Sequence, residues 1–231
     1  MLITIIIPCY NEKNTIRNIV DKILSLQNID LQIIIIDDFS TDGTVELLKN
    51  DILHRVDKII FHKKNKGKGA AIKSALSSIK GEIVIIQDAD LEYDPNDYFS
   101  LIEPFYNKNI NIVYGSRVLG RSKNQKKTLI QLYRIFGNYV LTKFSNFINN
   151  QKLTDAHTCY KAFRFKILNK IQLIEDDFSF CPEVTTKFSN INENIYEVPI
   201  SYNGREYKDG KKIRFSDALK AVKVILKYKY F

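Results

Sequence analysis

Short apolar runs, separated by segments with helical spacing, constrain the fold of this chain more than any other feature. The runs expected to form strands are Leu2–Ile7, Gln32–Ile36, Lys58–Phe61, Glu82–Gln87 and Ile110–Tyr114. The segments expected to form helices between them are Asn14–Leu26, Thr44–Leu48 and Gly69–Ile79. Strands that are apolar throughout are buried on both faces, as in parallel sheets covered by helices. We therefore predict an α/β fold with a mostly parallel central sheet flanked by helices.

The second half of the chain is less regular than the first. Its expected elements are helices over Thr128–Ile148, Glu183–Phe188 and Ser216–Lys229, and a strand over Tyr196–Ser201. Basic loops are expected at residues 120–127 and 203–212. Neither an internal repeat nor a Pro/Gly/Ser-rich linker divides the chain, so we predict one domain over residues 1–231.

The composition excludes several classes of protein. With 45% hydrophobic and 26% charged residues, the chain is neither disordered nor a disulfide scaffold. Its net charge of +9 favours an anionic partner: nucleic acid, lipid headgroups or phosphorylated small molecules. Three cysteines without a CxxC pair fit a reducing compartment and argue against a zinc site. We see no secretory signal and no apolar run of roughly 18–20 residues, so we expect a cytoplasmic protein without a spanning helix.

Acidic and polar residues follow three of the predicted strands. These clusters are Pro8–Glu12, Asp37–Gly43 and Asp88–Asp90. Ligands of open parallel sheets bind beyond the carboxyl ends of the strands, so the clusters are expected to share one crevice. Carboxylates that meet there repel one another unless a cation lies among them. An isolated Asp-x-Asp is usually a solvated turn, but in this setting Asp88 and Asp90 are suited to one Mg²⁺ or Mn²⁺ ion.

In this order, the clusters resemble the serial motifs of the family 2 glycosyltransferases. The matching segments are Pro8–Glu12, Asp37–Thr44, Asn65–Ala71, Asp88–Asp90, Gly115–Arg117 and Arg205–Lys212. Within that family, the chain is most similar to the branch that mannosylates dolichyl or polyprenyl phosphate. The resemblance implies the GT-A fold and a GDP- or UDP-linked sugar donor. It also implies that residues 1–118 bind the nucleotide sugar and residues 119–231 bind the acceptor.

The resemblance also implies roles for single residues. Those expected to hold the nucleoside are Pro8, Tyr10, Glu12, Ile36 and Asp38. Those expected at the metal ion and the diphosphate are Asp88, Ala89, Asp90 and Glu92. Those expected to bind phosphates of the donor or the acceptor are Arg117, Arg205 and Lys212. Phe39 departs from the family pattern, which usually has glycine there, so this turn must form without glycine.

The expected reaction decides whether a general base is needed. Departure of the nucleoside diphosphate builds negative charge, which a divalent ion and cationic side chains stabilise. The acceptor attacks the opposite face and inverts the anomeric configuration. A phosphate acceptor is already an anion, whereas a hydroxyl acceptor needs a base. Asp155 is the first candidate for that base and Glu183 the second, although either could instead cap a turn or a helix.

The C-terminal segment carries much of the positive charge. Between residues 200 and 231 there are nine basic and three acidic residues. An apolar stripe of Leu219, Val222, Ile225 and Leu226 runs beside the lysines, and aromatic residues end the chain. A basic amphipathic helix of this kind can lie on an anionic membrane surface, or its stripe can pack against the domain.

We therefore predict a metal-dependent, inverting glycosyltransferase that acts on a polyprenyl phosphate at the cytoplasmic membrane face. The alternative is a hydroxyl acceptor in the synthesis of a surface polysaccharide or glycolipid. A nucleotidyltransferase would need a glycine-rich N-terminal signature, and Pro8–Glu12 is not one. A nucleic-acid-binding protein is disfavoured because the acidic strand ends would repel phosphates.

Overall fold

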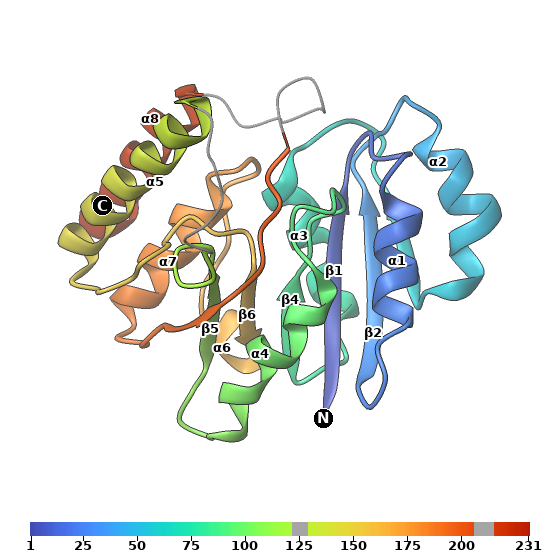
Figure 1. The fold of residues 1–231 in the computed structure, drawn as a ribbon, viewed down its shortest axis with the longest axis horizontal. Helices are drawn as coiled ribbons and strands as arrows, with labels where there is room; N and C mark the ends of the chain where they lie inside the picture. Colours follow the sequence, from blue (N-terminus) through green and yellow to red (C-terminus); the bar gives the residue numbers. More distant parts are fainter. Residues whose placement is uncertain (122–128, 206–214) are drawn as a thin grey trace.

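The structure is a computed structural model that describes residues 1–121, 129–205 and 215–231. The strands are β1 (Leu2–Cys9), β2 (Asp30–Asp37), β3 (Lys58–Phe61), β4 (Ile83–Ile86), β5 (Ile112–Ser116), β6 (Lys161–Arg164) and β7 (Tyr196–Pro199). The helices are α1 (Ile16–Leu24), α2 (Thr44–Leu47), α3 (Lys68–Ala75), α4 (Tyr98–Ile102), α5 (Leu129–Asn149), α6 (Phe165–Leu168), α7 (Phe180–Asn190) and α8 (Phe215–Tyr230). Figure 1 shows helices on both sides of a single sheet, which confirms the predicted α/β class.

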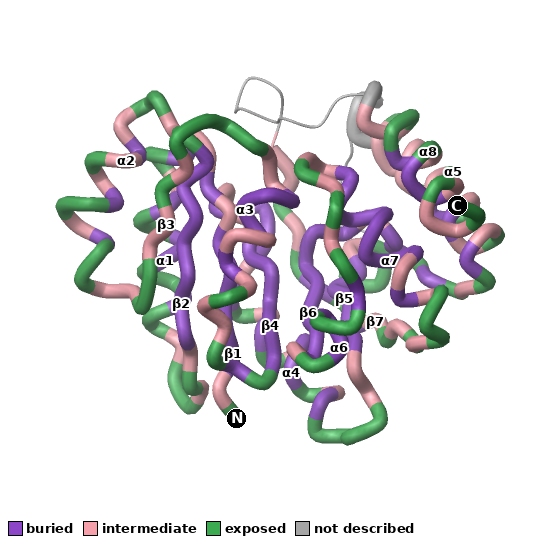
Figure 2. Tube along the Cα trace, turned by 180° about the vertical axis from the view of Figure 1, so that it is seen from behind, coloured by how far each residue is buried: buried purple, intermediate pink, exposed green. Residues whose placement is uncertain are grey.

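The sheet has the strand order β3-β2-β1-β4-β6-β5-β7 among the described residues. Pairing is parallel from β3 to β4 and again between β5 and β7. The central strands are buried, whereas the outer sides of the flanking helices are exposed (Figure 2). Because the sheet continues from the first half of the chain into the second, both halves share one core.

β6 is the strand that the sequence pattern did not predict. It lies between β4 and β5 and is antiparallel to both. Its sequence, Lys-Ala-Phe-Arg, begins and ends with a basic residue, yet all four residues are buried. Lys161 is accommodated because its Nζ donates to the carbonyl of Ala156 at 3.1 Å and lies 3.3 Å from the ring centroid of Tyr114. A buried strand that contains basic residues with such partners is not recognised by a search for apolar runs.

The register brings the predicted motifs to one edge of the sheet. Cys9 at the end of β1 is paired with Asp37 at the end of β2, and Ile6 is paired with Ile86 near the end of β4. The chain stays in register just beyond the strands, since the amide of Asp38 donates to the carbonyl of Cys9 at 2.8 Å. The three clusters that follow these strands therefore begin side by side.

The second half adds a layer of helices at the other end of the sheet. α8 packs against α7 and α5, and Figure 1 shows α5 and α8 next to each other at the left edge. Ala221, Val224 and Ile225 of α8 are buried in this contact, and Lys227 pairs with Glu175 at 2.8 Å. α8 is thus docked on the domain along much of its apolar side. Among the described helices, none is long and apolar enough to cross a bilayer.

Candidate active site

A pocket of about 370 Å³ lies beyond the carboxyl ends of β1, β2 and β4. The predicted site residues that line it are Pro8, Tyr10, Glu12, Asp38, Asp88, Ala89, Asp90, Glu92, Arg117 and Arg205. Ile36 does not line it, because its side chain is fully buried within β2. Lys212 lies outside the described residues. Residues from distant parts of the chain therefore surround one cavity.

Asp88 and Asp90 form the acidic end of this pocket. Burial, followed by the neighbouring charges of Asp88 and Glu92, raises the pKa of Asp90 to about 7. Arg205 partly offsets this crowding, since its Nη2 lies 3.0 Å from Asp90 Oδ2. Asp88 is paired with the ammonium of Lys68, a side chain that is almost entirely buried. The arrangement concentrates negative charge at one point and surrounds it with cations.

These carboxylates fit a hard divalent ion that takes its other ligands from a substrate. Among the described residues, no group of three His, Cys, Asp or Glu side chains is arranged to hold a metal ion. Mg²⁺ is commonly bound by one or two carboxylates together with substrate phosphates and water, so two aspartates suffice. The pKa of Asp90 is raised first by burial and then by the charges of Asp88 and Glu92, and a divalent ion would offset that charge repulsion.

Glu92, predicted as a further metal contact, is engaged with the segment that carries Arg205. Its carboxylate accepts hydrogen bonds from Tyr202 Oη at 2.8 Å and from the amide of Arg205 at 2.7 Å. The carbonyl of Glu92 also accepts from the amide of Asn203 at 2.9 Å. Glu92 therefore fixes the position of residues 202–205, and its role as a metal ligand stays a prediction.

Arg205 joins two of the strand-end motifs. Its two terminal nitrogens donate to the two carboxylate oxygens of Glu12, each at 3.1 Å, and one of them also reaches Asp90. Such a bidentate contact fixes the plane of the guanidinium as well as its position. Arg205 is therefore held over the acidic end of the pocket.

The guanidinium of Arg117 is held in place by the carboxylate of Asp155. The carboxylate of Asp155 accepts from Arg117 Nε at 2.7 Å, from Arg117 Nη2 at 2.8 Å and from Asn138 Nδ2 at 3.0 Å. Asp155 is fully buried, and burial alone would raise its pKa, but these partners outweigh burial and lower it. A buried carboxylate that is kept charged by a guanidinium suits an anchor for Arg117 better than a general base.

Glu183, the second candidate for a base, is also engaged in hydrogen bonds and an ion pair within the protein. It is fully buried near the start of α7 and accepts from the amides of Ile174 and Glu175 at 2.6 and 3.0 Å. Lys187, one turn later, pairs with it at 2.6 Å. It thus holds the segment before α7 in place, and it does not line the pocket.

Lys68, which lines the pocket, and His62, which contacts Asp38, are residues that the sequence analysis did not assign. His62 Nδ1 lies 2.7 Å from Asp38 Oδ1, and the amides of Lys66 and Gly67 donate to the same carboxylate. The signal for Lys68 was its place between Gly67 and Gly69 at the start of α3. Gly67 has a φ of +96°, and a Cβ on Gly69 would clash with the carbonyl of Glu175. The positive φ of Gly67 forms the turn before α3, and the missing side chain of Gly69 lets the backbone of Glu175 and Asp176 approach the start of that helix.

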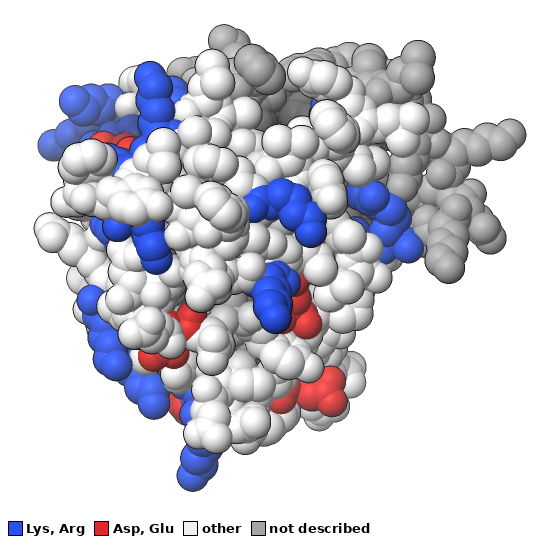
Figure 3. All heavy atoms as spheres, turned by 90° about the vertical axis from the view of Figure 1, so that its left-hand side faces the viewer, with Lys and Arg blue, Asp and Glu red and all other residues white. Residues whose placement is uncertain are grey.

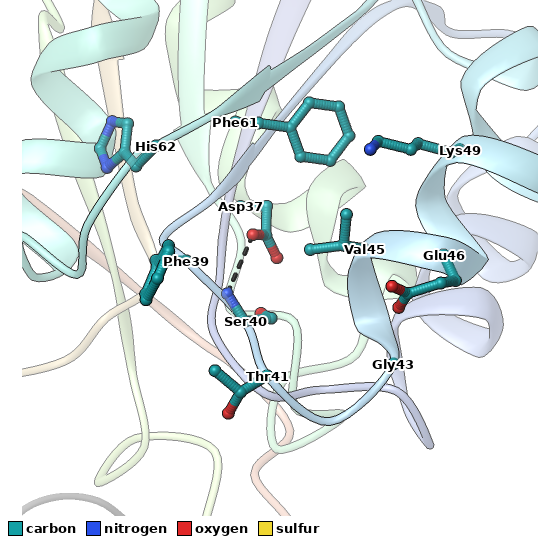
Figure 4. Close-up of a pocket in the computed structure, with 10 residues that line it drawn as sticks. All are labelled: Asp37, Phe39, Ser40, Thr41, Gly43, Val45, Glu46, Lys49, Phe61 and His62. Carbon is teal, nitrogen blue, oxygen red and sulfur yellow. Dashed lines mark hydrogen bonds between the residues drawn. The ribbon is translucent and has the colours of Figure 1, made fainter.

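The turn after β2 forms without glycine, as the sequence requires. Phe39 takes a left-handed conformation with a φ of 69°, which costs about 1–2 kcal/mol for a residue with a side chain. The amide of Ser40 donates to Asp37 Oδ2 at 3.0 Å and closes the turn. Phe39 borders a second hollow of about 640 Å³, with Phe61 and Lys49 on its far side (Figure 4). None of the predicted site residues lines this second hollow.

Comparison with known proteins identifies the family. Residues 4–172 match the glycosyl transferase family 2. The chain is 31% identical to the UDP-N-acetylglucosamine–dolichyl-phosphate N-acetylglucosaminyltransferase of Methanococcus voltae, over 89% of this chain and 87% of that protein. It is 26% identical to the dolichol-phosphate mannosyltransferase of Pyrococcus furiosus, over 91% of this chain but only 59% of that protein.

Solved structures give the same fold at lower identity. Glucosyl-3-phosphoglycerate synthase of Mycobacterium tuberculosis, in complex with Mn²⁺, UDP and phosphoglyceric acid, superposes with a TM-score of 0.75 and 16% identity. The match covers 99% of this chain and 78% of that one. The complex of the same enzyme with Mn²⁺ and UDP-glucose superposes with a TM-score of 0.74. At this identity, the likeness concerns the GT-A fold, which agrees with the predicted class.

Proposed function

The chain belongs to glycosyl transferase family 2, and we propose that it transfers a hexose from a nucleotide-diphospho-sugar to a polyprenyl phosphate with inversion. One observation carries the choice of acceptor. Besides the aspartates, a cation, Arg117, lines the pocket, and the carboxylate of Asp155 is paired with its guanidinium. This environment suits an acceptor that arrives as an anion, which needs no base.

The donor side of the proposal rests on Asp88, Asp90 and Arg205. Asp88 and Asp90 would hold a Mg²⁺ or Mn²⁺ ion, which supplies positive charge to the diphosphate as it leaves. Arg205, fixed by Glu12, adds a second positive charge at the same end of the pocket. Preorganised charge of this kind lowers the barrier because it is in place before the bond breaks. Structures of the mycobacterial synthase contain Mn²⁺ or Mg²⁺ together with UDP, which supports the proposal of a divalent metal ion here.

The acceptor side rests on the anchored guanidinium. Asp155 is itself positioned by Glu197, which accepts from the amides of Thr154 and Asp155 at 2.7 and 2.9 Å. Arg117 therefore cannot swing away without leaving a buried charge unpaired. We expect it to bind the phosphate of the acceptor and to hold one oxygen toward the anomeric carbon. The names of the methanogen and Pyrococcus relatives, both of which act on dolichyl phosphate, support this acceptor class.

A matrix of donors and acceptors tests the proposal. Purified protein with Mn²⁺ or Mg²⁺ is offered GDP- and UDP-linked sugars together with a short polyprenyl phosphate, the matching polyprenol, or phosphoglycerate. We expect transfer to the polyprenyl phosphate, none to the polyprenol, and an inverted anomeric centre by NMR. Transfer to the polyprenol or to phosphoglycerate would instead establish the alternative, an enzyme for a hydroxyl acceptor.

A further inference from the structure

The outer face of α5 is apolar and exposed. Its exposed large side chains are Leu132, Tyr133, Phe136, Tyr139, Val140 and Phe147, each between 47% and 84% exposed. The spacing of 132, 136, 139, 140 and 147 places them along one side of a helix. Single exposed apolar residues are ordinary, but a continuous stripe of this size marks an interaction surface. We call this stripe the α5 face.

The charge around the α5 face is of one sign. The sequence of α5, from Leu129 to Asn149, has no acidic residue. Of its two basic residues, Lys143 belongs to this face, whereas Arg134 lies on the inner side of the helix. Lys143 lies within the face, with its Nζ 5.4 Å from the ring centroid of Tyr139. Viewed from the side of α5 and α8, the surface is largely uncharged, and the Lys and Arg side chains in it outnumber the Asp and Glu side chains (Figure 3). An apolar stripe with cations and aromatic rings complements the interface of an anionic bilayer.

The inner side of the same helix reaches the pocket. Asn138 Nδ2 donates to Asp155, the anchor of Arg117, and Arg134 Nη1 donates to the carbonyl of Arg205 at 3.3 Å. α5 therefore lies between the α5 face and the residues that hold Arg117 and Arg205.

We propose that the α5 face rests on an anionic lipid bilayer and presents the pocket to a polyprenyl phosphate in that bilayer. The inference rests on the proposed function for the identity of the lipid substrate, but binding to the bilayer itself is separable from it. The proposal assigns membrane contact to α5, whereas the sequence pointed to the C-terminal helix, α8. Part of the apolar stripe of α8 packs against the domain, since Ile225 is fully buried. The α5 face, in contrast, is left uncovered by the described residues.

A second copy of the chain is a poorer occupant of this face. A symmetric dimer would bring two α5 helices together, and neither carries a carboxylate to pair with Lys143 of the other. Isologous interfaces must be self-complementary, which a face of one charge sign is not. A bilayer with anionic headgroups supplies both the apolar layer and the opposite charge.

Vesicle sedimentation with matched variants tests the proposal. The probes are vesicles of phosphatidylglycerol and phosphatidylcholine, or of phosphatidylcholine alone, without polyprenyl phosphate or nucleotide. We expect the wild type to bind the anionic vesicles at low salt, and the variant Phe136→Gln/Tyr139→Gln/Phe147→Gln to lose about tenfold or more in partitioning. The matched control is Phe99→Gln/Tyr106→Gln, which removes exposed rings outside α5 and should bind like the wild type.

A fluorescent reporter keeps the proposal testable if the triple variant misfolds. The chain has no tryptophan, so Phe136→Trp gives a single emission signal from the α5 face. We expect this emission to shift to the blue when anionic vesicles are added, while that of Tyr106→Trp stays unchanged. The two signals separate insertion of α5 from binding by any other surface.

Three outcomes would overturn the inference. They are no vesicle binding at low salt, equal binding by wild type and triple variant with no shift in the emission of Phe136→Trp, or a dimer in light scattering that the triple variant makes monomeric. Failure of the proposed function looks different: vesicle binding persists, but no sugar reaches a polyprenyl phosphate. In the opposite case, transfer to a short, water-soluble polyprenyl phosphate without any vesicle binding would leave the function standing and remove the docking surface.

Discussion

The acidic and the basic sides of the pocket are assembled in different ways. Asp88 and Asp90 come directly after β4, so the parallel register with β1 is enough to bring them to the edge of the sheet. Arg117 also follows a strand, but its guanidinium is aimed by Asp155, which is 38 residues further along the chain. One side depends on backbone geometry and the other on a buried pair of charges.

This difference predicts opposite responses to mutation. Removing a carboxylate from the crowded acidic side relieves repulsion, so the fold should tolerate it while the chemistry does not. Removing one member of the buried pair leaves the other charge without a partner, which costs both stability and function. The two sides can therefore be told apart by measuring folding and activity on the same variants.

Asp90→Ala should have the largest effect on transfer. Loss of the shared anchor for the metal ion and the diphosphate should abolish turnover, at least about 10²–10³-fold by the scale of other preorganised groups. Its free energy of unfolding should stay at or above that of the wild type, because burial and Asp88 already disfavour the charged form. Activity at saturating donor and thermal unfolding measure the two effects, with the exposed Asp30→Ala as the matched control. Turnover like that of the wild type would refute the assignment of Asp90.

Removal of divalent ions should give a loss of similar size without any mutation. EDTA should inactivate the wild type, and Mn²⁺ or Mg²⁺ should restore it. Isothermal titration should also show weaker nucleoside diphosphate binding in EDTA. Full activity after exhaustive chelation would mean that Lys68 and Arg205 alone stabilise the leaving group.

Asp155→Asn should show the contrasting behaviour. It leaves the guanidinium of Arg117, whose side chain is 20% exposed, without its counter-charge. We therefore expect a loss of about 1–3 kcal/mol in the free energy of unfolding. Because the pKa of Asp155 is lowered from 3.8, its contribution to stability is present above about pH 4 and is lost only as the pH falls through the native pKa. If Asp155 anchors Arg117, the variant should have a raised KM for the acceptor and an unchanged pH profile of activity near neutrality. A profile that loses an ionisation, with normal stability, would instead make Asp155 a general base.

The same contrast explains how much the sequence reveals. The strands β1 to β5 were predictable because each contains a run of apolar residues, and the ends of the strands located the acidic cluster. β6 was not, because Lys161 and Arg164 break the apolar run and are satisfied only by partners elsewhere, Ala156 and Ile110 among them. No local pattern records such partners, so a buried polar strand is visible only after the chain has folded.

The roles of the acidic residues follow the same division. Asp88 and Asp90 were found because their spacing and their place after a strand carry the signal. The engagement of Asp155 with Arg117, and of Glu92 with Tyr202, depends on separations of 38 and 110 residues. For that reason the sequence identified Asp155 and Glu92 as residues of interest but could not say what each one contacts.

Arg205 connects the two sides, and its variants should have an intermediate effect. Arg205→Ala loses the bidentate contact to Glu12 and a charge at Asp90, so we expect kcat/KM for the donor to fall about tenfold to a hundredfold. Arg205→Lys keeps the charge without the planar fork and should recover only part of this loss. Lys212→Ala should weaken donor use by a smaller amount. An unchanged kcat/KM in Lys212→Ala would leave that lysine as surface charge only.

Lys68→Met should have the smallest effect on turnover, but it should change the affinities for the metal ion and for the nucleotide in opposite directions. Lys68 is a resident cation on Asp88, so a divalent ion must compete with it for that carboxylate. Without the ammonium, Mn²⁺ alone should bind several-fold more tightly, whereas the nucleoside diphosphate should bind several-fold more weakly because it loses a charge-assisted contact. Calorimetric titration of each ligand measures the two changes separately, and Lys68→Arg should restore the second. If both ligands bound more weakly, Lys68 would act mainly by holding Asp88 in place, and the acidic side would then depend on a buried pair as much as the basic side does.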